Sequence, residues 1–110
     1  MKKRERVKSK ILFNEIINNG KKESNKFFTI FFIDKKDEQP LFGISAPKKT
    51  GNAVTRNKLK RQTRELIKET KLLFKNNRNY IIIIKKSCLD YSFQEKLDEL
   101  KRLIGEINEK

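Results

Sequence analysis

Residues 27–34 read FFTIFFID, an unbroken run of aromatic, β-branched and hydroxyl side chains that ends in an aspartate. Such residues favour β-strands, and apolar side chains at both odd and even positions indicate a strand covered on two faces. The run LFGISA, residues 41–46, predicts a second strand. The turn-forming sequence KKDEQP separates the two runs, so we expect them to pair as a hairpin. Pro47 ends the second strand because its nitrogen has no hydrogen to donate.

The segment before the first strand predicts a short helix. Ser9 is a suitable N-cap, and Gly20 is a suitable stop. Between them, apolar residues recur at helical spacing on one stripe: Leu12, Phe13, Ile16 and Ile17. KKESNK, residues 21–26, is then either a polar connection or a short edge strand.

The second half of the chain predicts a long helix, a strand and a closing helix. The long helix is expected from about Asn52 to Lys75, and YIIIIKK at residues 80–86 predicts a buried strand. Ser92 is the expected N-cap of the closing amphipathic helix, with Glu95 as its capping-box partner. The order predicts an α+β fold of the split β-α-β type with two layers. Helices on one face of the sheet would leave the other face free for a ligand.

Length and composition suit a single domain over residues 1–110. Residues 1–8 are expected to form a mobile basic arm. No apolar run is long enough for a membrane span, and no apolar region follows the basic N-terminus as in a secretory signal. Cys88 is the only cysteine, so no internal disulfide forms. We therefore expect a cytoplasmic protein without a membrane partner.

Positive charge is concentrated in two short segments. The formal net charge is +14, of which residues 1–10 contribute +5. Residues 47–64, PKKTGNAVTRNKLKRQTR, contribute a further +7 through seven Lys or Arg side chains and no acid. Segregated charge of this kind indicates a polyanion bound at defined places, with nucleic acid as the leading candidate. A solubilising basic surface and an anionic membrane are the alternatives.

A helical wheel of the long helix shows how this charge would be presented. Beside the core stripe runs one cationic stripe made of Asn57, Lys60, Arg61, Arg64, Lys68, Lys71 and Lys75. Arg56 lies on the core side but in the first turn. The turn at Gly51 can supply a positive φ, and the free N–H groups that follow it suit an anion. In the strand before, Phe27, Phe31 and Ile33 share one face, which is either core or a platform for unpaired bases.

The chain offers little for catalysis by its own side chains. It has no histidine, a lone cysteine, and neither a P-loop nor a dinucleotide-binding glycine pattern. The acids are scattered among lysines, and no pair stands out for general acid–base chemistry. We therefore expect no catalytic residue and no metal site in the protein alone.

Residues 48–65, KKTGNAVTRNKLKRQTRE, resemble the signature of the bacterial ribonuclease P protein subunit, a KK-x-G-x-AV-x-RN-R/K-x-KR-x-x-RE pattern. The early helix that ends at Gly20, the FGIS strand and the Tyr-Ile-Ile-Ile strand extend the resemblance. The resemblance implies an α-β-β-β-α-β-α order, a four-stranded sheet and a left-handed β-α-β crossover, an exception to the usual handedness. It also implies an accessory subunit of an endoribonuclease whose RNA, with Mg²⁺ held mainly by that RNA, removes the 5′ leader of precursor tRNA.

The resemblance assigns residues to two surfaces and implies no obligate protein partner. The catalytic RNA subunit would be bound by Lys48, Lys49, Arg56, Asn57, Lys58, Lys60, Arg61, Arg64 and Lys68. A cleft for the precursor-tRNA leader would use Phe13, Ile17, Phe27, Phe31, Arg56 and Asn57. Three positions depart from the commonest family residues: Lys58 replaces Arg, Ile17 replaces an aromatic, and Phe31 replaces the Tyr of some relatives.

Two other readings remain open on composition alone. A ribosomal or other RNA-binding protein of similar fold would carry the same charge, and only the signature separates the two. A DNA-binding protein would read bases from one end of the basic helix, whereas these cations form a long side stripe suited to phosphates. A self-contained nuclease lacks candidate catalytic residues.

Overall fold

The computed structural model of the chain describes residues 3–110. Its helices and strands, in chain order, are η1 (Lys3–Glu5), α1 (Lys10–Asn19), β1 (Lys21–Ser24), β2 (Phe28–Asp34), β3 (Leu41–Ser45), η2 (Lys48–Thr50), α2 (Ala53–Thr70), η3 (Lys71–Leu73), β4 (Arg78–Ile84), η4 (Lys86–Asp90) and α3 (Phe93–Asn108). The expected α+β class and α-β-β-β-α-β-α order are confirmed, and KKES forms the extra edge strand. Within residues 3–110 no helix is long and apolar enough to cross a membrane.

The four strands form one mixed sheet in the order β1-β2-β4-β3. β2 pairs antiparallel with β1 and with β4, while β3 pairs parallel with β4. The expected β2–β3 hairpin is therefore wrong, because β4 lies between the two strands. Six of the seven β4 residues are buried and one is half-buried, so this strand is best accommodated where it has a neighbour on both edges.

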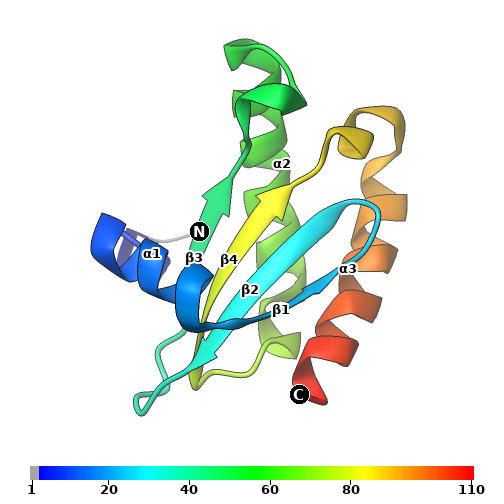
Figure 1. The fold of residues 1–110 in the computed structure, drawn as a ribbon. Helices are drawn as coiled ribbons and strands as arrows, with labels where there is room; N and C mark the ends of the chain where they lie inside the picture. Colours follow the sequence, from blue (N-terminus) through cyan, green and yellow to red (C-terminus); the bar gives the residue numbers. More distant parts are fainter. Residues whose placement is uncertain (1–2) are drawn as a thin grey trace.

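Helices cover the two faces of the sheet unequally (Figure 1). α2 and α3 lie behind the sheet in this view, and α1 crosses in front of it near the start of β4. The expectation of a helix-free second face therefore holds for only part of that face. β3 and β4 point the same way, with β4 on the right and α2 behind, so the β3-α2-β4 connection is left-handed as the family resemblance implies.

The main core lies between the sheet and the α2–α3 pair. Phe28, Ile30 and Phe32 of β2 point into it together with the apolar sides of both helices. Phe42, Phe74 and Tyr80 form an aromatic cluster with ring centroids 4.8–5.4 Å apart. The Tyr80 hydroxyl donates to the Lys75 carbonyl at 2.8 Å, and burial raises the pKa of Tyr80 to about 12. The phenol is therefore a neutral donor that ties β4 to the loop before it.

The expected helix starts rest on local hydrogen bonds that the structure contains. The expected end of the long helix at Lys75 is wrong, because α2 ends at Thr70 and the 3-10 turn η3 follows it. Ser9 and Asn52 accept from the N–H groups of Leu12 and Thr55, and Ser92 and Glu95 form the predicted capping box. α1 ends at Gly20, where an added Cβ would lie 2.5 Å from the Ile16 carbonyl oxygen and 2.7 Å from that of Phe32. The lack of a side chain at Gly20 thus lets the helix end lie directly on β2.

The N-terminal segment differs from the expected mobile arm. Val7 donates to the Phe42 carbonyl at 3.0 Å, and Arg6 forms a parallel bridge with Phe42 on the outer edge of β3. Glu5 is buried and forms an ion pair with Lys71. Residues 5–7 therefore close the β3 edge of the sheet, while residues 1–2 of the expected arm lie outside the described residues.

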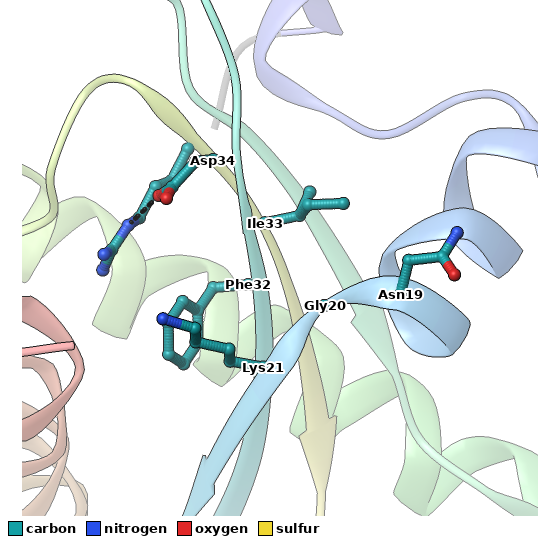
Figure 2. A pocket seen from close by; sticks show the side chains of 7 residues that line it. Asn19, Gly20, Lys21, Phe32, Ile33 and Asp34 are labelled. Carbon is teal, nitrogen blue, oxygen red and sulfur yellow. Dashed lines mark hydrogen bonds and ion pairs between the residues drawn. The ribbon is translucent and has the colours of Figure 1, made fainter.

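Arg78 joins the far end of the sheet to the C-terminal helix. Its side chain is buried and donates from Nε to Asp34 at 2.7 Å, from Nη1 to the Ile107 carbonyl at 2.9 Å and from Nη2 to the Lys110 carbonyl at 3.1 Å. Figure 2 shows the contact to Asp34 as a dashed line beside a pocket of about 190 Å³. Because the guanidinium is already bonded to these three acceptors, this pocket is part of a structural joint.

We predict that Arg78→Met lowers the free energy of unfolding by about 2–3 kcal/mol, because it removes the three hydrogen bonds by which the buried guanidinium joins Asp34 to the carbonyls of Ile107 and Lys110. Asp34→Asn is the matched control. The Asp34 side chain is mostly exposed and the replacing amide oxygen can still accept, so we expect a loss of no more than about 1 kcal/mol. Chemical denaturation measures both, and equal losses would contradict the assigned role of Arg78.

Candidate nucleic-acid interface

The basic signature begins in a tight turn that only glycine adopts easily. After η2, Gly51 has φ 153° and ψ −171°, a region that L side chains rarely enter. Asn52 then caps α2 by accepting from the Thr55 N–H at 2.9 Å. The positive φ expected at Gly51 is confirmed. The turn sets the direction in which α2 leaves the end of β3.

The signature side chains line the outer surface of this turn and of α2. Lys48, Lys49, Asn57, Lys58, Arg61 and Lys68 are exposed, whereas Arg56, Lys60 and Arg64 are half-buried. Within residues 3–110, the ion pairs involve other lysines and arginines, and none involves a signature cation. Their charges repel one another without a nearby acid bonded to them, so a polyanion can neutralise them.

The cations spread from the sheet side of α2 to its α3 side. Arg64 lines a small hollow of about 140 Å³ at the edge of β3, together with Phe42, Gly43 and Ile44, and Arg6 lines the same hollow. Lys58 and Arg61 line a different hollow, next to Phe93 at the start of α3. The structure therefore presents the signature as a broad cationic surface wrapped around the solvent side of one helix.

Part of the second sheet face is uncovered and carries an aromatic ring. We define this open sheet face as Lys22, Ser24, Thr29, Phe31, Ser45 and Ile83, all exposed or half-buried. Strand register places Lys22, Phe31, Ile81 and Gly43 in one row across the sheet. The Lys22 ammonium lies 5.9 Å from the centre of the Phe31 ring. This ring therefore has a cation beside it and solvent access, as base stacking needs.

The structure brings some of the predicted cleft residues to this face. A Cβ on Gly43 would lie 3.6 Å from Phe13 Cδ2, so Phe13 of α1 reaches over β3, two strands from Phe31. Ile17, one helical turn after Phe13, is half-buried. Arg56 and Asn57 lie in the first turns of α2, and no hydrogen bond or ring contact joins them to Phe31 among the described residues.

The prediction of Phe27 as a cleft residue is wrong. Its side chain is fully buried in the core on the α2–α3 side, with its ring 4.9 Å from that of Tyr91. β2 begins at Phe28, so the alternation of the strand does not extend back to residue 27. Phe27 stands in the turn before the strand, where its direction follows the turn and not the pleat.

Two cations at these surfaces were missed by the sequence reasoning. Arg6 was assigned to a mobile arm, but its bridge to Phe42 brings it to the hollow that Arg64 lines. Lys22 had no assigned role, but its pairing with Phe31 across the β1–β2 ladder brings it to the exposed ring. The position of Lys22 in a possible edge strand could have indicated that it lies beside Phe31. The position of Arg6 beside Arg64 depends on tertiary packing and has no signal in the sequence.

The fold and these two surfaces define a class: an α+β protein with an exposed basic helix and a partly open sheet face that carries an aromatic ring. Comparison with known proteins identifies the family. The family described as Ribonuclease P matches residues 1–108, and the chain belongs to it.

Curated relatives and solved structures agree with this assignment. The "Ribonuclease P protein component" of Bacillus cereus (strain B4264) is 38% identical over 97 residues, which cover 86% of this chain and 84% of the relative. The ribonuclease P protein of Thermotoga maritima superposes with a TM-score of 0.83 at 28% identity, covering 92% of this chain and 96% of that one. A Staphylococcus aureus ribonuclease P protein mutant, described as having defective mRNA degradation activity, superposes with a TM-score of 0.85 at 28% identity. The superposition covers 94% of this chain and 88% of that one.

The Gly51 turn predicts a difference between two glycine substitutions. We expect Gly51→Ala to lower the free energy of unfolding by about 1–3 kcal/mol, because the backbone conformation is unfavourable for alanine and the Thr55 side chain lies within 3.0–3.2 Å of the new methyl group. Gly105→Ala is the control. It lies inside α3 with nothing within 4 Å of the added carbon, and should stabilise by about 0.5–1 kcal/mol. Thermal unfolding of both variants checks the signs, and a neutral Gly51→Ala would contradict the strained turn.

Proposed function

We propose that this chain is the protein subunit of ribonuclease P, which binds the RNA subunit and the 5′ leader of precursor tRNA and aids removal of that leader. The observation that carries the proposal is the family match over nearly the whole chain, joined to a signature helix whose cations have no acidic partner within residues 3–110. The name of the curated relatives, ribonuclease P protein component, supports the same role. The proposal includes a cytoplasmic location.

The basic helix is proposed to dock on the RNA subunit. Phosphate oxygens would be bound by Lys48, Lys49, Arg56, Asn57, Lys58, Lys60, Arg61, Arg64 and Lys68. Arginine offers a planar fork of N–H donors that fits two phosphate oxygens, whereas lysine acts as a point charge. Lys58, where many relatives have arginine, keeps the charge and lacks the fork.

The open sheet face is proposed to hold the single-stranded leader. Phe31 would stack on one unpaired base, with Lys22 near the adjoining phosphates, and Phe13 and Ile17 would bound the path beside α1. Arg56 and Asn57 would meet the leader where it passes the start of α2. Phe27 has no part in this proposal, since it is buried in the core.

The hydrolysis itself is assigned to the RNA subunit. Mg²⁺, held mainly by that RNA, would activate water and stabilise the developing charge on the leaving oxygen. Within the described part of the chain, no group of three or more His, Cys, Asp or Glu side chains is arranged to hold a metal ion. The contribution of this protein is to hold two RNAs together against their mutual repulsion and to orient the leader.

Cleavage of a precursor tRNA by a bacterial ribonuclease P RNA, at low Mg²⁺ and near-physiological salt, tests the proposal. We expect strong stimulation by the wild-type protein and weaker stimulation by Arg61→Ala/Arg64→Ala. Two lost phosphate contacts should also reduce the slope of log affinity against log salt by about 1.4–1.8.

Lys101→Ala/Arg102→Ala is the matched control, because it removes the same charge from the exposed surface of α3. We expect it to retain stimulation and to change the salt slope little. Good binding to the RNA subunit without any stimulation of cleavage would overturn the ribonuclease P role and leave a general RNA-binding protein.

The open sheet face generates a separate prediction about the leader. Phe31→Ala should weaken binding of precursor tRNA by about 1–3 kcal/mol, the usual contribution of one base stacked on an aromatic side chain. Binding of mature tRNA, which has no leader, should be unchanged. Affinities of the RNA–protein complex for the two tRNAs measure the difference, and equal weakening for both would show that Phe31 does not contact the leader.

A further inference from the structure

Another concave surface lies between α2 and the segment that leads into α3. It is a hollow of about 490 Å³, within the range of ligand-binding pockets, and we call it the η4 hollow. Its lining comes from α2, from η4 and from the start of α3: Val54, Thr55, Lys58, Leu59, Gln62, Cys88, Leu89, Tyr91 and Lys96. Among the described residues, none of those that line it is acidic. In Figure 1, η4 is the turn that connects the upper end of β4 to α3.

Lys96 is a buried ammonium in the wall of this hollow. The residue is 3% exposed, and its Nζ donates to Gln62 Oε1 at 2.9 Å and to the Cys88 carbonyl at 3.1 Å. Within residues 3–110 it forms no ion pair with a carboxylate. Burial lowers the pKa of Lys96, and the nearby charge of Lys58 acts in the same direction while Cys88 opposes it. An added oxygen acceptor would therefore stabilise the charged form.

Two side chains that line the hollow, Lys96 and Gln62, have donor hydrogens without a partner among the described residues. The ammonium of Lys96 has three hydrogens, of which two are used by Gln62 and Cys88. Gln62 uses its side-chain oxygen to accept from Lys96, and its amide N–H₂ has no partner among the described residues. A ligand with two adjacent acceptors could therefore bond to both side chains at once.

The walls of the hollow are apolar and unusually exposed. Val54 is 77% exposed, Leu89 45% and Tyr91 38%, and Phe93 of the adjoining hollow is 39% exposed. The Lys26 ammonium lies 4.3 Å from the centre of the Tyr91 ring. Exposed apolar side chains around buried donors, with Lys26, Lys58 and Arg61 nearby, favour a flat, acceptor-rich ligand attached to negative charge.

We propose that the η4 hollow binds an unpaired guanine of an RNA strand. The guanine edge carries two adjacent acceptors, O6 and N7, which match the free hydrogens of Lys96 and Gln62. Adenine carries an amino group in place of O6 and would meet these donors with its own hydrogens. The apolar walls would contact the faces of the base, and Lys58 and Lys26 would neutralise the adjoining phosphates. The inference rests on the proposed function, because it assumes an RNA partner.

Inorganic phosphate and an acidic peptide fit the same surface less well. A phosphate would leave the apolar walls in water, whereas the flat base covers them. The carboxylate of an acidic peptide could accept a hydrogen bond from Lys96. A planar base edge fits the donors of Lys96 and Gln62 together better than such a peptide does. Base discrimination is therefore the property that separates the guanine site from a general anion site.

Binding of short single-stranded oligonucleotides to the full chain, without the RNA subunit, tests the proposal. The probes are an oligoadenylate, the same strand with one central guanine, and the same strand with one central inosine, which keeps O6 and N7 and lacks the 2-amino group. We expect the guanine and inosine strands to bind about tenfold more tightly than the oligoadenylate. Fluorescence anisotropy at fixed salt measures the three affinities.

Three variants locate the site. Lys96→Met removes the buried donor, and Val54→Trp fills the hollow from an exposed position without altering Lys96, so it covers the case in which Lys96→Met does not fold. Both should abolish the guanine advantage. Phe31→Ala, on the open sheet face, should weaken binding of all three strands alike and so retain the guanine advantage. If only Phe31→Ala abolishes the guanine advantage, guanine is recognised by the open sheet face and the proposal for the η4 hollow is overturned.

Other results would overturn the guanine site. Equal affinities of the three strands for the wild-type protein would do so, as would a guanine advantage that survives both hollow variants. Binding of an acidic leucine-containing peptide that Val54→Trp abolishes, with no base preference, would assign the hollow to a protein partner. If the protein stimulates precursor-tRNA cleavage but does not prefer guanine, the proposed function stands and the guanine site is overturned. If the protein prefers guanine but does not stimulate cleavage, the guanine site stands and the proposed function is overturned.

Discussion

The pairing of β4 with two strands at once is the constraint on which the rest of the structure depends. β4 lies antiparallel to β2 and parallel to β3, so the chain must leave the end of β3 and return along one face of the sheet before β4 begins. α2 is that return path. Its apolar stripe is held against the sheet, and its remaining surface must face solvent. The cations of α2 therefore lie on the part of the helix surface that this packing leaves outside the core.

Charge is distributed so that structural ion pairs and unpaired cations lie in different places. Glu5 pairs with Lys71 beyond the end of α2, and Asp34 pairs with the buried Arg78 at the far end of the sheet. The signature cations have no such partners within residues 3–110. Mutual repulsion makes this arrangement unfavourable for the free protein. A polyanion bound to this surface would relieve that repulsion and so stabilise the domain.

The features that the sequence predicts correctly are mostly those that depend on residues close together in the chain. Ser9, Asn52 and the Ser92–Glu95 pair act as caps because their side chains reach backbone N–H groups a few residues away, without help from the rest of the chain. Gly51 similarly indicates a backbone conformation with positive φ, which other residues rarely adopt. Two expectations are wrong, one because of a distant strand and one because of the residue at which a strand starts. The hairpin assignment failed because β4 displaces β3 from β2, and Phe27 was misplaced because the strand starts one residue later than its composition suggests.

The residues by themselves determined the α+β class, the caps, the buried strands and the basic signature, because each depends on side chains within one or two helical turns or on strand alternation. Only the tertiary structure decided the sheet order, the position of residues 5–7 on the edge of β3, and the meeting of Arg6 with Arg64. It also decided that Lys96, on the apolar side of an amphipathic helix, lies buried beside Gln62. These features join segments far apart in the chain, and their energies depend on burial and long-range pairing that no local pattern records.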